Sequence, residues 1–264
     1  MRFWRGCRVV EPPTLVFGLK QAWACLFGGL MLGMILLTRL WWPDIGIARY
    51  DAWFVAALAI QLGMVMFRLE TWEEARVILI FHLVGTGMEL FKTAAGSWSY
   101  PEDAFFRIAG VPLFSGFMYA CVGSYMARIQ RIFDIRFSAY PPRWMTLVLA
   151  VAIYVNFFSH HYVVDLRWLL LTAIAALYWG SAMHYRVFRF QHRMPMLVAF
   201  LLVALFIWIA ENIATWSNAW VYPDQVHGWT LVSWSKLGSW YLLMFISVVL
   251  VTLVHPPRPY QQDS

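Results

Sequence analysis

The chain has 264 residues, of which 61% are hydrophobic and only 13% are charged, and its formal net charge is +6. An apolar share this far above one half excludes an ordinary soluble domain and predicts an integral membrane protein. The positive charge does not indicate a nucleic acid partner, because the arginines are scattered at the ends of apolar segments, where they orient helices in a membrane.

Eight apolar segments are long enough, or nearly long enough, to cross ~30 Å of hydrocarbon as helices. In chain order they cover approximately residues 15–40, 52–69, 75–95, 108–129, 144–158, 166–183, 196–215 and 231–254. The fold class predicted from them is all-α, a polytopic membrane helix bundle with about eight transmembrane helices.

Two stretches of the chain carry nearly the same motif, 122 residues apart. Residues 89–102 (ELFKTAAGSWSYPE) and 211–224 (ENIATWSNAWVYPD) are identical at five of fourteen positions; composition alone would give roughly one identity. Gly116 with Gly238, and Tyr119 with Tyr241, keep the same offset. We interpret the pattern as an internal duplication and name the two stretches the first and second Tyr-Pro motifs.

The duplication predicts one integral membrane domain built from two four-helix repeats, residues 1–133 and 144–264, with a connector at residues 134–143. Four spans per repeat is an even number, so a parallel four-plus-four repeat results, with its axis along the membrane normal.

Lysines and arginines near the span ends are divided unequally between the two sides. One side carries Arg2, Arg5, Arg8, Arg68, Arg76, Arg128, Arg131, Arg136, Arg143, Arg186, Arg189, Arg193 and Arg258, and the other carries Arg39, Arg49, Arg107, Arg167 and Lys236. The positive-inside rule predicts a multi-pass protein with both termini in the cytoplasm. Both Tyr-Pro motifs then face the outside.

Each Tyr-Pro motif begins with a glutamate inside an apolar run, Glu89 or Glu211. An ionised carboxylate is costly there unless it is paired, protonated or facing a polar cavity, which favours a functional role. His82 lies two turns before Glu89 on the same helix face and adds a base. We predict that these three residues are the catalytic acid–base groups. A structural hydrogen bond between helices is the alternative for the glutamates.

The rest of each motif supplies hydroxyl and aromatic side chains suited to lining a pocket for an apolar ligand. These candidates for substrate binding are Thr93, Trp98, Tyr100, Thr215, Trp220 and Tyr222. The aromatic residues are also typical of the interfacial belt of a membrane protein. Lys92 is expected to pair with Glu89 or to extend toward the outer interface.

Neither a cofactor nor a metal site is predicted. Cys7, Cys25 and Cys121 have no paired spacing and are interpreted as free thiols. Whether His160 and His161 bind a metal together with Asp165 is left open by the sequence, although no further spacing typical of metal ligands supports it.

The run from His82 to Glu89, followed by Gly96-Ser-Trp-Ser-Tyr100-Pro101 and Gly110-Val-Pro-Leu113, resembles the bacterial integral membrane family called domain of unknown function 817. That resemblance covers most of the chain and implies the bacterial cytoplasmic (inner) membrane, but no activity. More distantly, the glutamate, the aromatic-x-Tyr and the Gly-Val-Pro resemble carotenoid hydratases and duplicated-type lycopene cyclases. This second resemblance implies proton-initiated chemistry at both glutamates.

Three functions stay open at this point. The first is an intramembrane enzyme of lyase or isomerase type that uses the buried carboxylates on an isoprenoid or another lipid. The second is a small-molecule or proton-coupled transporter, and the third is a non-catalytic structural or assembly protein. The expected partners are membrane lipids and an apolar small molecule, and the sequence does not determine the oligomeric state.

Overall fold

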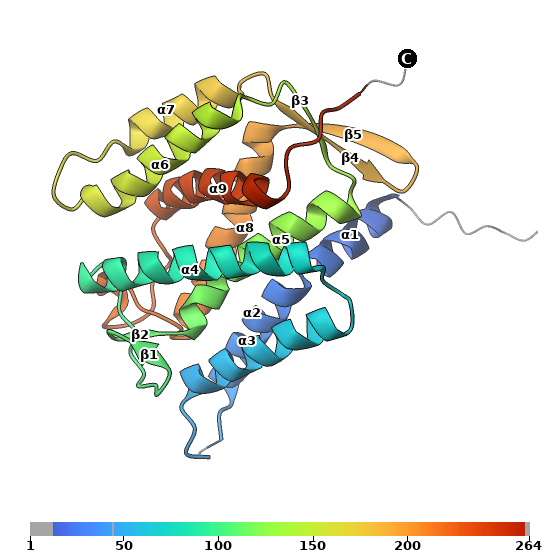
Figure 1. Ribbon diagram of the computed structural model, residues 1–264. Helices are drawn as coiled ribbons and strands as arrows, with labels where there is room; N and C mark the ends of the chain where they lie inside the picture. Colours follow the sequence, from blue (N-terminus) through green and yellow to red (C-terminus); the bar gives the residue numbers. More distant parts are fainter. Residues whose placement is uncertain (1–12, 44, 262–264) are drawn as a thin grey trace, which may run out of the picture.

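The computed structural model describes residues 13–43 and 45–261 (Figure 1). Cys7 and the arginines at positions 2, 5 and 8 lie outside the described residues. The described chain is mostly helical, as predicted. Its helices are α1 (Pro13–Ala24), α2 (Leu26–Leu40), α3 (Arg49–Met66), α4 (Trp72–Ala94), α5 (Phe114–Ile132), α6 (Arg143–Ser159), α7 (Arg167–Tyr178), α8 (Met196–Trp216) and α9 (Ser235–Val254), with a short 3₁₀ helix η1 (Pro223–Gln225).

Three helices, α4, α8 and α9, are long and apolar enough to cross a membrane, and the bent pair α1 and α2 makes a fourth candidate. Helices α6 and α7 are apolar but shorter. Length and composition in the described chain therefore support a membrane protein with three to four candidate spans, fewer than the eight expected from the sequence. One reason is that α5 carries Arg128 and Arg131 together with several Gly, Ser and Tyr residues.

The predicted first span, residues 15–40, is broken at Cys25 into α1 and α2, which meet at an angle of 71°. Gly28 and Gly29 lie in the first turn of α2, three and four residues after the break. Glycine has low helix propensity and is common at helix kinks, so these residues explain why one apolar run forms two helices.

The prediction of an all-α fold needs correction, because five short strands occur in the described chain. They are β1 (Arg107–Ile108), β2 (Val111–Pro112), β3 (Arg136–Ser138), β4 (Ala182–Val187) and β5 (Phe190–Pro195). The last three form an antiparallel sheet in the order β3-β4-β5. Helix α7 ends at Tyr178, so the predicted sixth span is shorter than expected and runs through a turn into β4.

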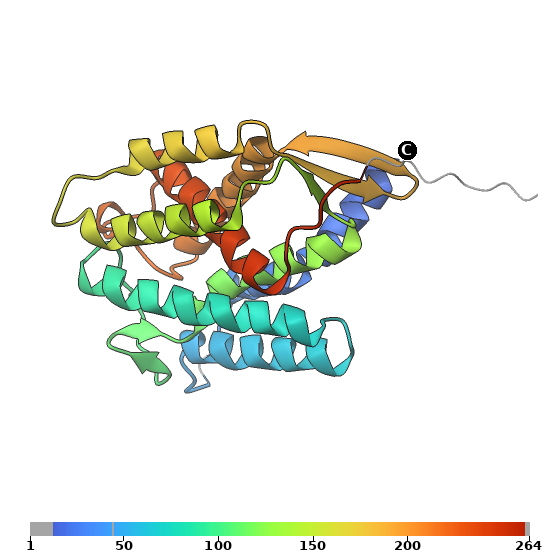
Figure 2. The same ribbon diagram turned by 45° about the horizontal axis from the view of Figure 1, so that its top comes forward.

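The sheet and the two Tyr-Pro motifs lie at opposite ends of the molecule. Figures 1 and 2 show β4 and β5 at one end and the loops that follow α4 and α8 at the other. Between these ends, α5 packs against α2, α3 and α4, while α9 packs against α6, α7 and α8. Helices α5 and α9 also contact each other, which places both of them at the centre of the bundle.

Helices α4 and α5 approach each other closely through glycines. A Cβ atom on Gly85 would lie 2.5 Å from the ring of Tyr119, and one on Gly116 would lie 2.4 Å from Thr86 Oγ1. Gly238, which the repeat offset pairs with Gly116, has no atom nearer than 3.9 Å to such a Cβ. The contact between α4 and α5 is therefore tighter than the corresponding contact between α8 and α9.

Candidate functional site

The two Tyr-Pro motifs adopt the same backbone course after their helices. Gly96 (φ +71°) and Asn218 (φ +56°) occupy matching positions, and both have the left-handed conformation that Gly and Asn tolerate best. The amide of Ser97 donates to the Lys92 carbonyl and the amide of Ala219 to the Ala214 carbonyl, each at 2.9 Å. Both helices thus end in the same type of C-terminal cap.

The two motifs also pair with each other. Ser99 and Val221, which the repeat offset makes equivalent, exchange two backbone hydrogen bonds of 3.0 and 2.9 Å in an antiparallel bridge. An antiparallel pair of this kind has a local two-fold axis through its centre. Next to the bridge, the rings of Trp98 and Tyr222 pack edge to face with centroids 6.1 Å apart.

Glu89 is buried, with 5% of its surface exposed, and is surrounded by three uncharged donors. Its Oε2 accepts hydrogen bonds from Trp98 Nε1 at 2.8 Å and from the Tyr100 hydroxyl at 2.5 Å. Its Oε1 accepts from the Tyr119 hydroxyl at 2.8 Å. Trp98 and Tyr100 come from the loop after α4 and Tyr119 comes from α5, so the carboxylate joins three parts of the first half.

Glu211 has a similar but smaller set of donors and is 3% exposed. Its Oε1 accepts from the Tyr222 hydroxyl, and its Oε2 accepts from Trp240 Nε1 at 2.6 Å. Tyr222 matches Tyr100 in the repeat, whereas Trp240 on α9 matches Met118, which cannot donate a hydrogen bond to Glu89. Within the described chain, no basic nitrogen lies within 4.0 Å of either carboxylate.

The hydroxyl groups of Tyr100 and Tyr222, in the two loops, stay protonated and so can donate hydrogen bonds. Burial, followed by the charge of Glu89, raises the pKa of Tyr100 well above its ordinary value, and burial with the charge of Glu211 does the same for Tyr222. Both hydroxyls therefore keep their protons at physiological pH and can hold the glutamates by hydrogen bonds.

Both glutamates face one large cavity of about 770 Å³. Most of its lining is aliphatic, aromatic or methionine side chains from α2, α5, α8 and α9. The lining follows α8 from Met196 to Glu211, a distance of roughly 22 Å at ~1.5 Å per residue, and reaches Phe137 in β3. The cavity thus extends from the Tyr-Pro motifs to the sheet.

The structure brings together six of the nine predicted site residues on the lining of this cavity: Glu89, Trp98, Tyr100, Glu211, Trp220 and Tyr222. The other three lie elsewhere. His82 packs against Phe117, with ring centroids 4.6 Å apart, beside the close contact of α4 and α5. Thr215 is hydrogen bonded to Asn212 and Trp229, and the buried Thr93 hydroxyl has no partner among the described residues.

Several residues of the site were not predicted from the sequence. Tyr119 and Trp240 donate hydrogen bonds to the glutamates. In the sequence, Tyr119 was noted only because it pairs with Tyr241 at the repeat offset. Lys92 was expected either to pair with Glu89 or to extend toward the outer interface; its Nζ lies 3.1 Å from His161 Nε2, so the pair with Glu89 is not formed. The lysine therefore contacts the loop between α6 and α7, while the glutamate accepts three hydrogen bonds from uncharged donors.

The adjacent histidines lie at the same end of the cavity as Lys92. Their rings are 4.1 Å apart, and Asp165 accepts a hydrogen bond from Asn156 and lies 3.4 Å from Arg167. In the described chain, no three side chains of the metal-ligating kinds are grouped closely enough to hold an ion. Burial, followed by the charge of Lys92, lowers the pKa of His161, so its Nε2 is available to accept from the lysine.

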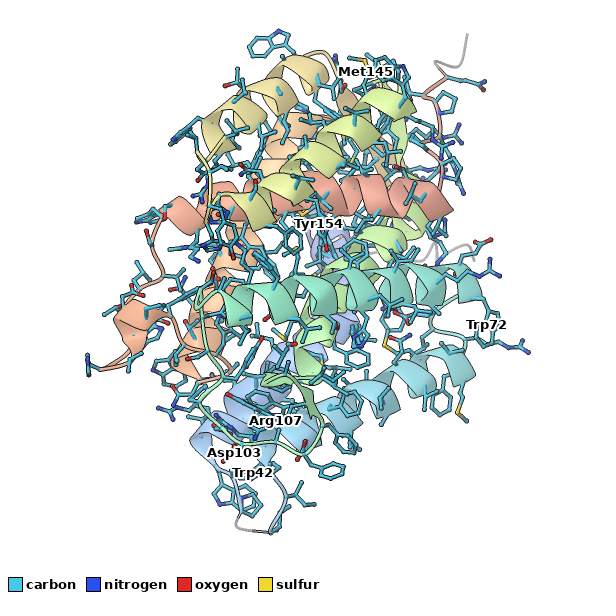
Figure 3. The ribbon with its side chains drawn as sticks, turned by 60° about the vertical axis from the view of Figure 1, so that its left-hand side comes forward. Trp42, Trp72, Asp103, Arg107, Met145 and Tyr154 are labelled. Atoms are coloured by element: carbon cyan, nitrogen blue, oxygen red, sulfur yellow. The ribbon has the colours of Figure 1, made fainter. Side chains whose placement is uncertain are left out.

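The outer surface near the motifs is polar and aromatic. Figure 3 shows Asp103 and Arg107 together toward one end of the molecule, and Trp72 at the start of α4 toward the other side of the view. Arg107 Nη1 donates to Asp103 Oδ1 at 2.9 Å, and both side chains are well exposed. In the same region, Arg49 forms an ion pair with Glu102.

Comparison with known proteins gives two matches. A family model described as "Protein of unknown function (DUF817)" matches residues 14–248. The "Uncharacterized protein YoaT" of Bacillus subtilis (strain 168) is 43% identical over 235 residues, which cover 89% of each chain. No solved structure matches. Neither match is a carotenoid hydratase or a lycopene cyclase, so that resemblance gains no support from them.

Proposed function

Since this chain belongs to the family DUF817, which is described only as a family of unknown function, we propose its function from the site: it is an intramembrane enzyme that performs acid–base chemistry on a lipid or isoprenoid. One observation carries the proposal. Glu89 and Glu211, from separate halves of the sequence, line the same large apolar cavity. Two titratable groups in one apolar pocket can act as the acid and the base of a proton-transfer enzyme.

The donors around the glutamates suit this chemistry. Neutral Trp and Tyr groups stabilise an ionised carboxylate by hydrogen bonds without fixing it in an ion pair, and the apolar surroundings stabilise the protonated form. One glutamate then gives a proton to a double bond of the bound lipid while the other, ionised, removes a proton from a neighbouring carbon, so that the double bond shifts and the elemental composition of the lipid is unchanged. His82 is outside the cavity and has no part in this proposal.

The two halves also support a duplicated architecture. Helices α4 and α8 end 122 residues apart, at Ala94 and Trp216, and α5 and α9 end with the same offset, at Ile132 and Val254. The bridge between Ser99 and Val221 joins equivalent residues. We propose two parallel repeats, residues 1–133 and 144–264, in the bacterial cytoplasmic membrane, with both termini in the cytoplasm and the Tyr-Pro motifs outside.

A carrier is the second candidate, and the length of the cavity favours it. The lining begins at the Tyr-Pro motifs and reaches β3 at the opposite end of the bundle. A carrier needs such a path and uses buried carboxylates to bind a proton or cation. The largely apolar lining along α8 fits a lipid better than a polar solute, so the enzyme remains the preferred function.

Untargeted mass spectrometry of lipid extracts, after chromatography that separates isomers, tests the proposal. We expect one lipid to decrease and another to increase when a host expresses the wild-type chain, and we expect no such change with Glu89→Gln. Glu73→Gln is the matched control, because Glu73 is exposed in the first turn of the same helix.

A lipid composition that wild-type protein leaves unchanged would contradict the enzyme and favour the carrier. A change that survives Glu89→Gln would indicate that the carboxylate only ties α4 to its neighbours, because glutamine keeps an acceptor oxygen for these hydrogen bonds.

A further inference from the structure

One end of the cavity is lined by basic side chains. Lys92 at the end of α4, His160 and His161 after α6, Arg167 at the start of α7 and Lys236 at the start of α9 all contribute to this end of the lining. We name these five residues the basic cluster. They come from four separate segments, so the fold, and not a local run of charge, brings them together.

Lys92 is buried, with 6% of its surface exposed. Its Nζ is close to the neutral Nε2 of His161 and lies 5.7 Å from the centre of the Phe157 ring. Within the described chain, no carboxylate oxygen lies within 4.0 Å of this nitrogen. A buried ammonium group without a counter-ion is costly, which points to an anion that binds next to it.

Lys236 also lines this end of the cavity and is half-buried. Its Nζ lies over the ring of Tyr222 at 4.1 Å and near the ring of Trp98 at 5.6 Å. Glu211 and Asp224 attract it at longer range, but in the part of the chain that is described no carboxylate forms an ion pair with it. Its contacts are therefore aromatic faces, which attract cations but leave the donors of the ammonium group available.

The charges of the basic cluster do not balance locally. Lys92, Lys236 and Arg167 repel one another, and Asp165 is the carboxylate paired with Arg167. The three cations and Asp165 alone have a formal charge of +2, and Glu211 and Asp224 act on Lys236 only at longer range. A dianionic group there would offset the repulsion, whereas a single carboxylate would offset half of it.

From this arrangement we propose that the basic cluster binds the phosphate of a phosphorylated lipid, whose hydrocarbon tail fills the apolar part of the cavity. The volume of about 770 Å³ is within the range of cavities that enclose a ligand of this size (~300–1,000 Å³). The inference deepens the proposed function by naming the class of lipid, and it rests on that function for the entry of a lipid into the cavity.

Binding to the full-length protein in detergent tests the inference without any turnover. Three probes are compared: farnesyl phosphate, farnesol, which has the same tail without the phosphate, and inorganic phosphate. The fluorescence of the tryptophans that line the cavity, Trp98, Trp220 and Trp240, reports occupancy. We expect farnesyl phosphate to bind at least about tenfold more tightly than either other probe.

Variants of the basic cluster sharpen the test. Lys92→Gln and Lys236→Gln are each expected to weaken farnesyl phosphate binding by about tenfold and to leave farnesol binding unchanged. Lys20→Gln is the control, because Lys20 donates to the carbonyls of Ile132 and Arg186 and is not part of the cavity lining. Unchanged farnesol binding shows that a variant is folded.

Equal affinity for farnesol and farnesyl phosphate would overturn the inference, as would full affinity for farnesyl phosphate in both lysine variants. Inorganic phosphate that binds as tightly as farnesyl phosphate would show a site for the free anion, which also overturns the lipid assignment. Glu89→Gln and Glu211→Gln should bind farnesyl phosphate normally. This result separates the two proposals, because a failure of acid–base chemistry leaves phosphate binding in place.

Discussion

Arg128→Met is expected to lower the free energy of unfolding by about 3–5 kcal/mol, since it leaves a buried carboxylate without its cation. Arg128 Nη2 donates to Glu70 Oε1 at 2.7 Å, and both side chains are 0% exposed. Ser124 donates to the same oxygen at 2.7 Å, and Gln61 donates to the other at 2.6 Å. The network ties α3, the turn between α3 and α4, and α5 together.

Denaturant titration of the purified protein measures this effect. Arg107→Met is the control, because its pair with Asp103 is exposed and such pairs contribute roughly 0.5 kcal/mol. The double variant Glu70→Met and Arg128→Met should recover part of the loss, because it removes both buried charges. A stability of Arg128→Met equal to that of the control would mean that Glu70 is not buried against this arginine.

Glu89→Gln and Glu211→Gln are each expected to reduce turnover of the lipid substrate by about 10²–10⁴-fold, the usual contribution of general acid–base catalysis. The double variant should be hardly worse than either single variant, because residues that act as one unit give non-additive effects. This expectation follows from their place on one cavity.

Turnover by the purified protein, compared among the wild type, both single variants, the double variant and Glu73→Gln, gives the measurement. If each half of the protein held its own independent site, each single variant would keep about half of the activity, and only the double variant would lose it. That pattern would contradict a shared cavity. Farnesyl phosphate binding in the same variants provides the check that they are folded.

The glutamates could be predicted from the sequence because a carboxylate within an apolar run is a local signal, and both glutamates occupy the same position in the repeat. The Tyr-Pro motifs were found for the same reason. The contacts between the two halves of the site could not be predicted. The pairing of Ser99 with Val221, and the donation from Trp240 to Glu211, are tertiary contacts between segments far apart in the chain.

The basic cluster was not predicted because the local sequence around each of its members gives no sign of a shared site. Arg167 and Lys236 were counted only as charges at span ends, and the two histidines were weighed only as metal ligands. A charged residue at a helix end has the same local sequence pattern whether it faces solvent or a cavity. Here the tertiary structure places the ends of α4, α7 and α9 around one cavity, which the sequence does not show.

The strands and the bend between α1 and α2 were missed for another reason. Hydropathy identifies long apolar segments well, but β4 and β5 are six residues each and partly polar; apart from Ala182 and Met183, they lie between the predicted sixth and seventh spans, where no element was predicted. Hydropathy does not locate a helix break within a continuous apolar run, and only Gly28 and Gly29 indicated the bend between α1 and α2. Periodicity over such short stretches is a weak signal.

The central claim is that Glu89 and Glu211 share an apolar cavity that a lipid can enter and that each of them can take up and release a proton there. Dicyclohexylcarbodiimide, an apolar reagent that enters membranes and reacts with protonated carboxyl groups, tests this claim most directly. Peptide mapping by mass spectrometry after treatment of membranes over a range of pH should find adducts on both glutamates. A water-soluble carbodiimide should modify Glu73 in preference to either of them. Absence of the apolar adduct from both residues at every pH, or equal labelling of them by the water-soluble reagent, would contradict the account.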